Sequence, residues 1–563
     1  MNIKIAWIRR LAALCLCVLV MALPAAPARA EAKDITKQCR FKVSEGSRDK
    51  LTDGNVRSMW TYDRKDAYVA VKLPDDAQAG WLRVEWLYDP TGYELIEYDA
   101  DMNPIRQRDQ GDMFPNVYSV FELLPETKYI QLKMTVKGQQ IGTVAVYSAG
   151  DLPAGVQQWQ APVEKADLMV VSTHQDDELI FLGGTIPYYA TALKKPTVIV
   201  YMANCGRYRR AEALNALWKM GVKNYPEFIN LKDEKVDSIN AGIRLWGGKD
   251  EILSLIVERI RRFKPEVIVT QDLDGEYGHN QHKITARAMQ YAIDAAADET
   301  QFPESLAKYG AWQVKKLYHH LYKENQIEMD WETPLDSLGG HTALEVAKLG
   351  MNEHASQLKY YRVKSHGTYD NAKFGLYSTT VGPDVEKNDF LENIDPDASE
   401  KYLAEHADEI AARRAAEAQE AADAVAAAIA RDEAEEALAR EAAEAEPEGD
   451  APEDAGADEA DAAGEEDAPV EAADEPLPGD GPGEEGEAPT ASDGAVDAPQ
   501  PTTPPQAAPL PTAAPAATRE ERGSSALPIV MIGAGVVAIG VGGWYGWRSM
   551  DRGRRRRRHR SRR

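Results

Sequence analysis

The sequence predicts a Rossmann-like α/β domain that is preceded by a β-sandwich and followed by a disordered stalk and one transmembrane helix. In the middle of the chain, the apolar runs DLMVVST, TVIVYMA and EVIVTQD alternate with amphipathic segments such as DEILSLIVERIRRF. Buried strands alternating with amphipathic helices are typical of a parallel sheet with helices on both faces. Before them, short stretches alternate apolar with polar residues, and after them the chain becomes acidic and proline-rich. The three regions therefore differ in fold class.

Residues 1–30 have the composition of a secretory signal peptide. A basic start containing Lys4, Arg9 and Arg10 precedes a short apolar run, and the small residues Ala28 and Ala30 follow it. Such a segment is cleaved during export and contributes nothing to the fold. An uncleaved anchor helix is the alternative, but the short apolar run favours cleavage.

Residues 31–160 are expected to form the β-sandwich. The stretches AYVAVKL, WLRVEWLY and YIQLKMTV alternate in polarity and are separated by turn-rich segments. That rhythm is typical of short, half-buried strands. Trp60, Trp81 and Trp86 are expected either in the core of this sandwich or on a glycan-binding face.

Residues 161–390 are expected to form the α/β domain, in which two polar clusters follow predicted strands. The cluster HQDDE at 174–178 comes directly after DLMVVST, and the cluster GEYGHNQH at 275–282 comes shortly after EVIVTQD. In sheets of this class, ligands bind outside the carboxyl ends of the strands. A parallel sheet can therefore bring the two clusters together although they lie far apart in sequence.

The two clusters predict a divalent-metal site formed by His174, Asp177 and His282. Zinc in a hydrolase takes three histidine or carboxylate ligands and keeps one position open for water. Ligand type alone does not separate zinc from iron or manganese. Taken singly, HxxDE can be a helix cap and HxxH a solvated turn. Their joint occurrence at two strand ends favours the metal site.

Three further residues are predicted to carry the chemistry. Asp176 is expected to act as the general base that takes a proton from water. Attack on a carbonyl produces an oxyanion, which a protonated His279 and Tyr277 are expected to stabilise. His279 is also expected to protonate the leaving amine.

The HQDDE and HNQH motifs resemble the (A/P)HPDDE and HPDH signatures of the PIG-L/LmbE-like (GlcNAc-PI de-N-acetylase-like) deacetylases. The similarity extends over residues 166–383 and includes RRAE at 209–212, MGV at 220–222 and HASQ at 354–357. It implies removal of an acetyl group from N-acetylglucosamine-type sugars.

The same resemblance implies a role for each residue of the two motifs. It makes His174, Asp177 and His282 the metal ligands, Asp176 the base, His279 the transition-state histidine and Tyr277 an active-site tyrosine. The sequence departs from the family pattern in two places. Gln175 replaces a proline, and Asn280-Gln281 replace the usual pair between the histidines. None of these residues is a ligand in the family pattern, so the site is expected to persist.

The start of the predicted sandwich, with LTDG at 51–54 and Trp60, resembles discoidin-like (galactose-binding-like) sandwiches. Modules of that family often bind glycans. A structural spacer is the alternative.

Other polar residues near the motifs are expected to have ordinary roles. Arg209 and Glu212 are expected to form an ion pair at a helix start, with substrate contact as the alternative. Cys205 is expected to be a buried thiol rather than a nucleophile, and a disulfide between Cys205 and Cys39 is not expected. His354 could either pack or support the site. Four remaining histidines have no partner pattern: His319, His320, His341 and His366.

The end of the chain is expected to hold the domain at a membrane. Residues 391–446 are predicted to form an Ala/Glu-rich helix, and residues 447–525 an acidic, proline-rich disordered stalk. Residues 526–547 are uncharged and long enough for a transmembrane helix. The Arg-rich residues 548–563 then mark the cytoplasmic side. The catalytic part is thus expected outside a bacterial cell, on a single-pass anchor.

The composition excludes one class of partner and leaves three functions open. The formal net charge of −26 argues against nucleic-acid binding. The preferred function is a cell-surface, zinc-dependent N-deacetylase of an N-acetylglucosamine-type sugar or glycan. A hydrolase of another amide or ester is the second. A glycan-binding surface protein whose hydrolase domain is inactive is the third.

Overall fold

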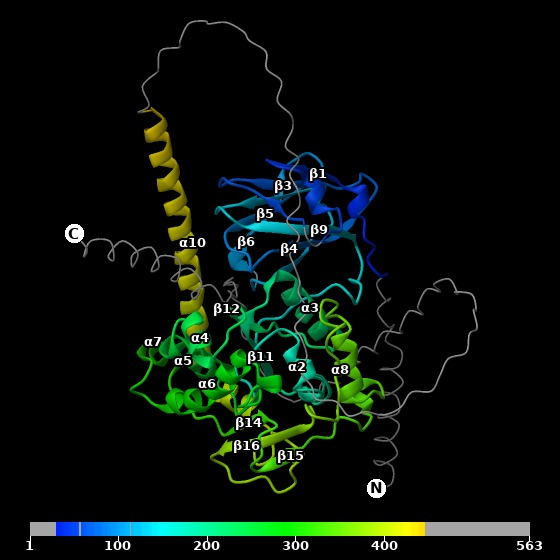
Figure 1. Cartoon of the computed structure of the whole chain (residues 1–563). Helices are drawn as coiled ribbons and strands as arrows, with labels where there is room; N and C mark the ends of the chain where they lie inside the picture. Colours follow the sequence, from blue (N-terminus) through cyan, green and yellow to red (C-terminus); the bar gives the residue numbers. More distant parts are fainter. Residues whose placement is uncertain (1–29, 56–57, 113, 445–563) are drawn as a thin grey trace, which may run out of the picture. The chain divides into compact units, whose positions relative to one another are not determined.

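The computed structural model describes residues 30–55, 58–112 and 114–444 (Figure 1). Residues 1–29 of the predicted signal peptide lie outside the described residues, as do the predicted stalk, the predicted transmembrane helix and the predicted cytoplasmic tail. Among the helices that are described, none is long and apolar enough to cross a membrane. Described residues up to Glu436 belong to one compact unit, whereas residues 437–444 belong to a second.

The first part of the chain forms two antiparallel sheets. The five-stranded sheet has the order β1 (Arg40–Val43), β3 (Tyr68–Lys72), β8 (Tyr129–Met134), β5 (Tyr93–Tyr98) and β6 (Pro104–Asp109). The four-stranded sheet has the order β2 (Trp60–Thr61), β9 (Gln140–Ser148), β4 (Ala79–Trp86) and β7 (Tyr118–Glu122). Short 3-10 turns accompany them: η1 (Thr36–Gln38), η2 (Arg48–Leu51) and η3 (Gln110–Asp112).

The inward-facing residues of both sheets form one core, as in a β-sandwich. Strands β3 and β8 alternate buried with partly exposed residues, which matches the alternating polarity of their sequences. Trp60 and Trp86 are buried in this core, and Trp81 donates from Nε1 to the carbonyl of Gly150 at 2.9 Å. Of the two expected positions, Trp60 and Trp86 therefore occupy the core of the sandwich.

The second part contains a seven-stranded sheet. Its order is β12 (Glu227–Lys232), β11 (Thr197–Asn204), β10 (Leu168–Ser172), β13 (Val267–Thr270), β14 (Lys316–His320), β16 (Lys373–Thr379) and β15 (Gln326–Glu328). The strands from β12 to β14 are parallel, and β16 is antiparallel to both of its neighbours. Strand order reverses between β10 and β13, which creates a topological switch point beside the central strand.

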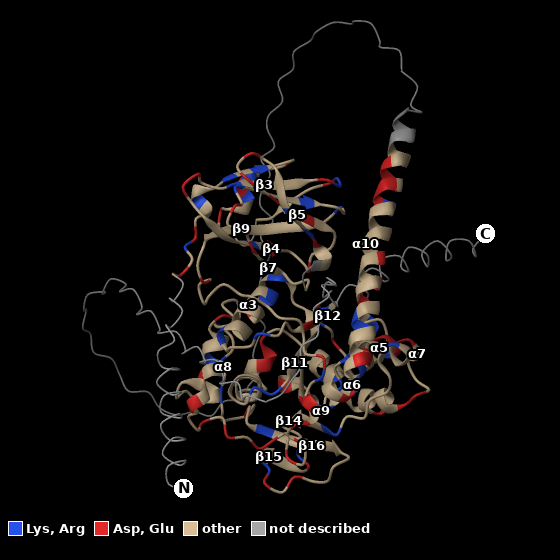
Figure 2. Cartoon of the chain, turned by 180° about the vertical axis from the view of Figure 1, so that it is seen from behind, with Lys and Arg blue, Asp and Glu red and all other residues tan. Residues whose placement is uncertain are grey.

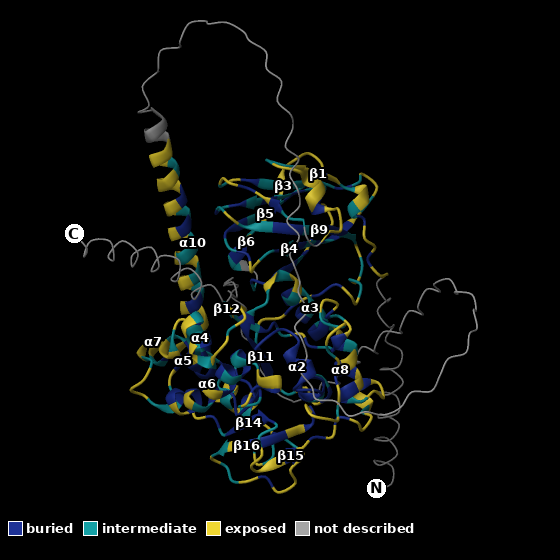
Figure 3. Ribbon diagram, in the orientation of Figure 1, coloured by how far each residue is buried: buried dark blue, intermediate teal, exposed yellow. Residues whose placement is uncertain are grey.

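Helices cover both faces of this sheet, as the sequence predicts. Leu168 and Val170 of β10 face one core, and Met169 and Val171 face the other. The first core also contains residues of α2 (Asp177–Ile180), the π-helical turn η4 (Pro187–Ala192), α3 (Gly206–Lys219) and α8 (Ala343–Met351). The second contains residues of α4 (Ile239–Leu245), α5 (Lys249–Phe263) and α6 (Asn280–Ala297). The buried strands appear between these helices in Figure 3.

The remaining helices follow the sheet or connect its strands. They are α7 (Pro303–Tyr309), α9 (Ala398–Glu405) and α10 (Ala407–Glu444), with 3-10 turns η5 (Glu276–Gly278) and η6 (Asp336–Leu338). The start of α10 is tied to the α/β part because Arg414 Nε donates to Glu164 Oε1 at 2.7 Å. Acidic side chains are distributed along α10 (Figure 2), and most of its residues are exposed (Figure 3).

Candidate metal centre and active site

The candidate site lies at the carboxyl ends of β10 and β13, at the switch point. His174 follows β10 by two residues, and Asp177 begins the short helix α2. After β13, the chain passes through η5, and His282 lies in the first turn of α6. The sheet therefore brings the two sequence clusters together as predicted.

Three ligand atoms of the predicted metal site converge. The distance from His174 Nδ1 to Asp177 Oδ2 is 2.9 Å, and that from His174 Nδ1 to His282 Nε2 is 3.1 Å. His282 Nε2 and Asp177 Oδ2 are also 3.1 Å apart. When two ligand atoms each lie 2.0–2.1 Å from one ion, they are about 3 Å apart in compact geometries and no more than about 4 Å apart in others. The donor set and its spacing therefore fit a zinc-like ion.

The outer nitrogen of each of these two imidazoles faces an oxygen acceptor. His282 Nδ1 donates to Glu276 Oε2 at 2.7 Å, which leaves the lone pair on Nε2 toward Asp177. His174 Nε2 lies 2.9 Å from Gln281 Oε1. Outer-shell oxygens of this kind fix the tautomer and orientation of ligating histidines. Gln281, which departs from the family pattern, therefore contacts a predicted ligand although it is not a ligand itself.

Glu276 and His320 form a buried pair behind His282 that the sequence interpretation missed. Both side chains are fully buried, and His320 Nδ1 lies 2.8 Å from Glu276 Oε1. The other nitrogen of His320 lies 3.1 Å from the carbonyl of Asp370. Burial raises the pKa of Glu276, but the hydrogen bonds from His282 and His320 outweigh it and hold the pKa at about 2. The expectation that His320 has no specific partner is therefore wrong.

A second grouping of nitrogen ligands overlaps the first. Ligand atoms of His174, His279 and His282 lie within 4.8 Å of one another. The set that contains Asp177 is tighter, because all of its separations are 3.1 Å or less. We therefore assign Asp177, rather than His279, as the third position of the candidate site.

His279 is placed to meet a bound molecule. Its Nδ1 is buried and has no hydrogen-bond partner among the described residues. Burial, and then the charges of His282 and His174, lower its pKa to about 4. A neutral imidazole can still donate one N–H bond to a developing oxyanion. The predicted role of His279 as a protonated acid remains a prediction.

Asp176 combines a raised pKa with an unusual backbone. Burial and the neighbouring charge of Asp177 raise its pKa to about 7, although Arg209 opposes the shift. Arg209 Nη2 contacts Asp176 Oδ1 at 2.5 Å and the carbonyl of Gln175 at 2.8 Å. The φ angle of Asp176 is 141°, a value that side-chain-bearing residues rarely adopt and that often marks a functional site.

The predicted ion pair between Arg209 and Glu212 is wrong. Arg209 pairs with Asp176, and Glu212 accepts two hydrogen bonds from Ser356, from N at 2.8 Å and from Oγ at 2.6 Å. Arg209 and Glu212, which both belong to α3, therefore contact different segments around the site. His354, two residues before Ser356, is fully buried, with Nε2 3.6 Å from Glu178 Oε1.

These side chains surround an open pocket of about 470 Å³. Tyr277 adopts a left-handed backbone conformation with φ of 49° and is 47 % exposed. The lining residues are His174, Asp176, Asp177, Ile180, Arg209, Asp233, Tyr277, His279, Gln357 and Tyr361. Every predicted site residue except the fully buried His282 thus lines the pocket.

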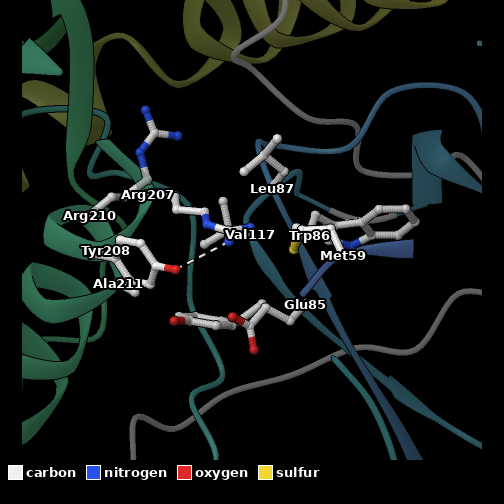
Figure 4. A pocket seen from close by; sticks show the side chains of 10 residues that line it. Met59, Glu85, Trp86, Leu87, Val117, Arg207, Tyr208, Arg210 and Ala211 are labelled. Atoms are coloured by element: carbon white, nitrogen blue, oxygen red, sulfur yellow. Dashed lines mark hydrogen bonds between the residues drawn. The ribbon is translucent and has the colours of Figure 1, made fainter. Parts of the chain in front are cut away.

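A different pocket lies between β4 and the start of α3 (Figure 4). Its lining includes Met59, Trp86 and Leu87, together with Arg207 and Arg210. It contains no histidine and a single carboxylate, that of Glu85. Its lining therefore lacks the groups that hydrolysis requires. Cys39 and Cys205 are both free thiols, and each is partly buried.

Residues 169–293 match the family described as PIG-L: GlcNAc-PI de-N-acetylase. This match confirms the family resemblance that the two motifs indicate. The chain is 28% identical over 179 residues to a 1D-myo-inositol 2-acetamido-2-deoxy-alpha-D-glucopyranoside deacetylase of Geodermatophilus obscurus, covering 27% of this chain and 60% of that relative. It is 27% identical over 258 residues to the protein of the same name in Rhodococcus erythropolis, covering 38% and 87%.

Solved structures resemble the two folded parts separately. The N,N'-diacetylchitobiose deacetylase of Pyrococcus horikoshii matches 35% of this chain and 74% of its own, with 15% identity and a TM-score of 0.26. A fucose binding module of Streptococcus pneumoniae matches 21% of this chain and 98% of its own, with 14% identity and a TM-score of 0.18. The lectin binding domain of lectinolysin gives 12% identity and a TM-score of 0.17.

Proposed function

We propose that the α/β domain is a metal-dependent N-deacetylase that removes acetyl from an N-acetylglucosamine-type sugar or glycoconjugate. The observation that carries this proposal is the convergence of His174 Nδ1, Asp177 Oδ2 and His282 Nε2 within 3.1 Å, beside the buried carboxylate of Asp176. The family match and the deacetylase relatives support the choice of an acetamide as substrate.

His174, Asp177 and His282 would hold the ion. When bound there, zinc supplies a Lewis acid and makes water more acidic at neutral pH. Their outer partners, Gln281 and Glu276, keep the two imidazoles oriented for this task.

Asp176 carries the proton during the reaction. Ionised Asp176 removes a proton from water as the water oxygen attacks the acetamide carbonyl carbon. His279 donates an N–H bond to the oxygen on which negative charge develops, and Tyr277 lies beside it, with the two ring centroids 5.6 Å apart. When the C–N bond breaks, Asp176 returns its proton to the leaving nitrogen, and acetate and the free amine result.

Acetate release from N-acetylglucosamine and N,N'-diacetylchitobiose tests this function. We expect the full chain to release acetate. The release should stop after chelation of the metal and should resume when zinc is restored. The matched control is Asp176→Asn, which retains the side-chain shape and should be inactive with metal bound. Release that survives complete metal removal would contradict the proposal. Tight glycan binding without release by the metal-loaded protein would favour the glycan-binding alternative.

We also propose that the site faces the exterior of a bacterial cell on a single-pass anchor. The support is in the sequence: a signal-like start, the apolar segment 526–547 and the Arg-rich end. Protease treatment of intact cells should remove the catalytic part, while a variant truncated before residue 526 should be released into the medium. Protection of the catalytic part in intact cells would contradict this location.

A further inference from the structure

Aromatic side chains gather beside the candidate active site. We call Phe181, Tyr277, Tyr360, Tyr361 and Tyr369 the aromatic wall. Tyr277 and Tyr361 line the pocket and are stacked, with ring centroids 6.4 Å apart and an interplanar angle of 27°. Tyr369 meets both Tyr277 and Phe181 edge-on, at 6.5 Å and 6.0 Å. The wall therefore extends beyond the residues that line the pocket.

Much of this wall is open to solvent. Tyr277 is 47 %, Tyr360 60 % and Tyr369 38 % exposed, whereas Phe181 is buried behind them. Single exposed apolar residues are ordinary on a protein surface, but a contiguous group beside a pocket indicates a binding surface. Tyr277 and Tyr369 contact each other beside the pocket, and Tyr360 joins them through Tyr361, with ring centroids 6.3 Å apart, so the group forms such a surface.

The polypeptide that carries the wall is fixed at two points. Glu212 of α3 accepts both hydrogen bonds from Ser356, in the turn that leads to Tyr360 and Tyr361. The buried His320 contacts the carbonyl of Asp370, the residue after Tyr369. Both contacts are made by elements packed on the sheet. The tyrosine rings are therefore presented from an organised segment.

The chemistry of the wall selects its ligand. The pocket lining carries three carboxylates, Asp176, Asp177 and Asp233, and one guanidinium, Arg209, while the tyrosines of the wall offer neutral rings with hydroxyl groups. A saturated sugar ring has a face of C–H groups that packs on an aromatic ring and hydroxyl groups at its edge that bond to phenols.

We propose that the aromatic wall is a second subsite, which holds the sugar ring linked to the residue that loses its acetyl group. This inference rests on the proposed function and narrows its substrate to oligosaccharides or glycoconjugates with a ring next to the reacting sugar. Tyr369 and Tyr360 act in specificity and do not touch the reacting atoms.

Kinetics on two substrates test the subsite. The substrates are the methyl glycoside of N-acetylglucosamine, which has no second ring, and N,N'-diacetylchitobiose. Tyr369→Ala should lower kcat/KM for the disaccharide about five- to tenfold, mainly through a higher KM. The same variant should change kcat/KM for the methyl glycoside by less than about twofold. Tyr369→Phe retains the ring and should stay close to the unmodified chain. Tyr291→Ala is the control, because Tyr291 on α6 is 67 % exposed and does not line the pocket.

Binding measurements separate failure of the subsite from failure of the reaction. In the metal-loaded Asp176→Asn chain, calorimetry should show tighter binding of the disaccharide than of the methyl glycoside, and Tyr369→Ala should remove most of the difference. Equal affinities for the two ligands, or a difference that survives Tyr369→Ala and Tyr361→Ala, would overturn the subsite whether or not acetate is released. Absence of acetate release with normal disaccharide preference would overturn the reaction and support the subsite.

Discussion

His174 Nδ1 and His282 Nε2 lie 3.1 Å apart, although 108 positions separate the two residues in the sequence. The Asp177 carboxylate oxygen is within 3.1 Å of both nitrogens. His282 Nδ1 donates to Glu276, so the lone pair of the ring is on Nε2, which faces His174 and Asp177. Two imidazoles and a carboxylate that converge in this way would hold the shared cation that we propose.

Glu276→Gln should weaken metal binding without removing a ligand. The amide cannot accept from His282 and His320 as the buried carboxylate does, so the orientation of His282 is less well fixed. We expect zinc affinity to fall about 10- to 100-fold in a chelator competition assay. Glu328→Gln, at an exposed carboxylate on β15, is the control and should leave affinity unchanged. Unaltered affinity in Glu276→Gln would show that the outer carboxylate does not tune the site.

Activity should decline at acidic pH because Asp176 must be ionised to act as a base. Burial and the charge of Asp177 raise its pKa to about 7, so the protonated, inactive form accumulates below that pH. A bound cation favours the ionised form and moves the inflection lower. The pH profile of kcat/KM should therefore show an acidic limb with an inflection at or below about 7. A profile that stays flat down to pH 4 would contradict the role of Asp176.

Asp176→Gly should be more stable than Asp176→Ala. Both variants lose the base and should be inactive, but glycine tolerates the φ of 141° that alanine does not. The expected difference in the free energy of unfolding is about 1 kcal/mol, read from thermal denaturation. Asp233, which lines the same pocket, is not among the described residues with positive φ. There the order should reverse, with alanine the more stable replacement; the same order at both positions would argue against strain at Asp176.

Glu97→Gln should destabilise the sandwich. The buried Glu97 carboxylate accepts from Arg106 Nε at 2.6 Å, Arg108 Nη2 at 2.8 Å and Thr127 Oγ1 at 2.6 Å. Removing its charge leaves Arg106 and Arg108 without their carboxylate partner and should cost about 3 kcal/mol, seen as a lower Tm of the sandwich transition in calorimetry. Glu94→Gln, at a partly exposed neighbour on β5, should shift the transition much less.

The effect of Glu97 should also depend on pH. Burial raises its pKa, but the hydrogen bonds from Arg106, Thr127 and the Leu124 amide, with the charge of Arg108, outweigh this and lower it below its ordinary value. A lowered folded-state pKa means that the stabilisation is complete above the unfolded-state pKa of about 4.3 and is lost as pH falls. The Tm difference between the unmodified chain and Glu97→Gln should therefore narrow below about pH 4. A constant difference would contradict this.

The fold of the α/β domain and the position of its site could be predicted because both follow from local patterns. Continuous apolar runs such as DLMVVST identify strands buried on both faces, and parallel strands place their carboxyl ends at one edge. His174 and His282 each lie close behind such a run. Their proximity could therefore be predicted without knowledge of side-chain packing.

The outer parts of the site could not be predicted because they depend on strand order and loop packing. His320 ends β14, and only the pairing of β14 with β13 brings it to Glu276. Arg209 and Glu212 have ideal helical spacing for an ion pair, yet each has a better partner in another segment, Asp176 and Ser356. Tyr369 joins the aromatic wall through a long irregular segment that carries no periodic signal.

Metal content of the full chain tests the central claim most directly. After equilibration with zinc and removal of excess ion, elemental analysis should find one zinc per chain in the unmodified protein and in Asp176→Asn, and close to none in His282→Ala. Circular dichroism of each variant would verify that it is folded. Full zinc occupancy in folded His282→Ala, or none in the unmodified chain, would contradict the assignment of His174, Asp177 and His282 as the metal site.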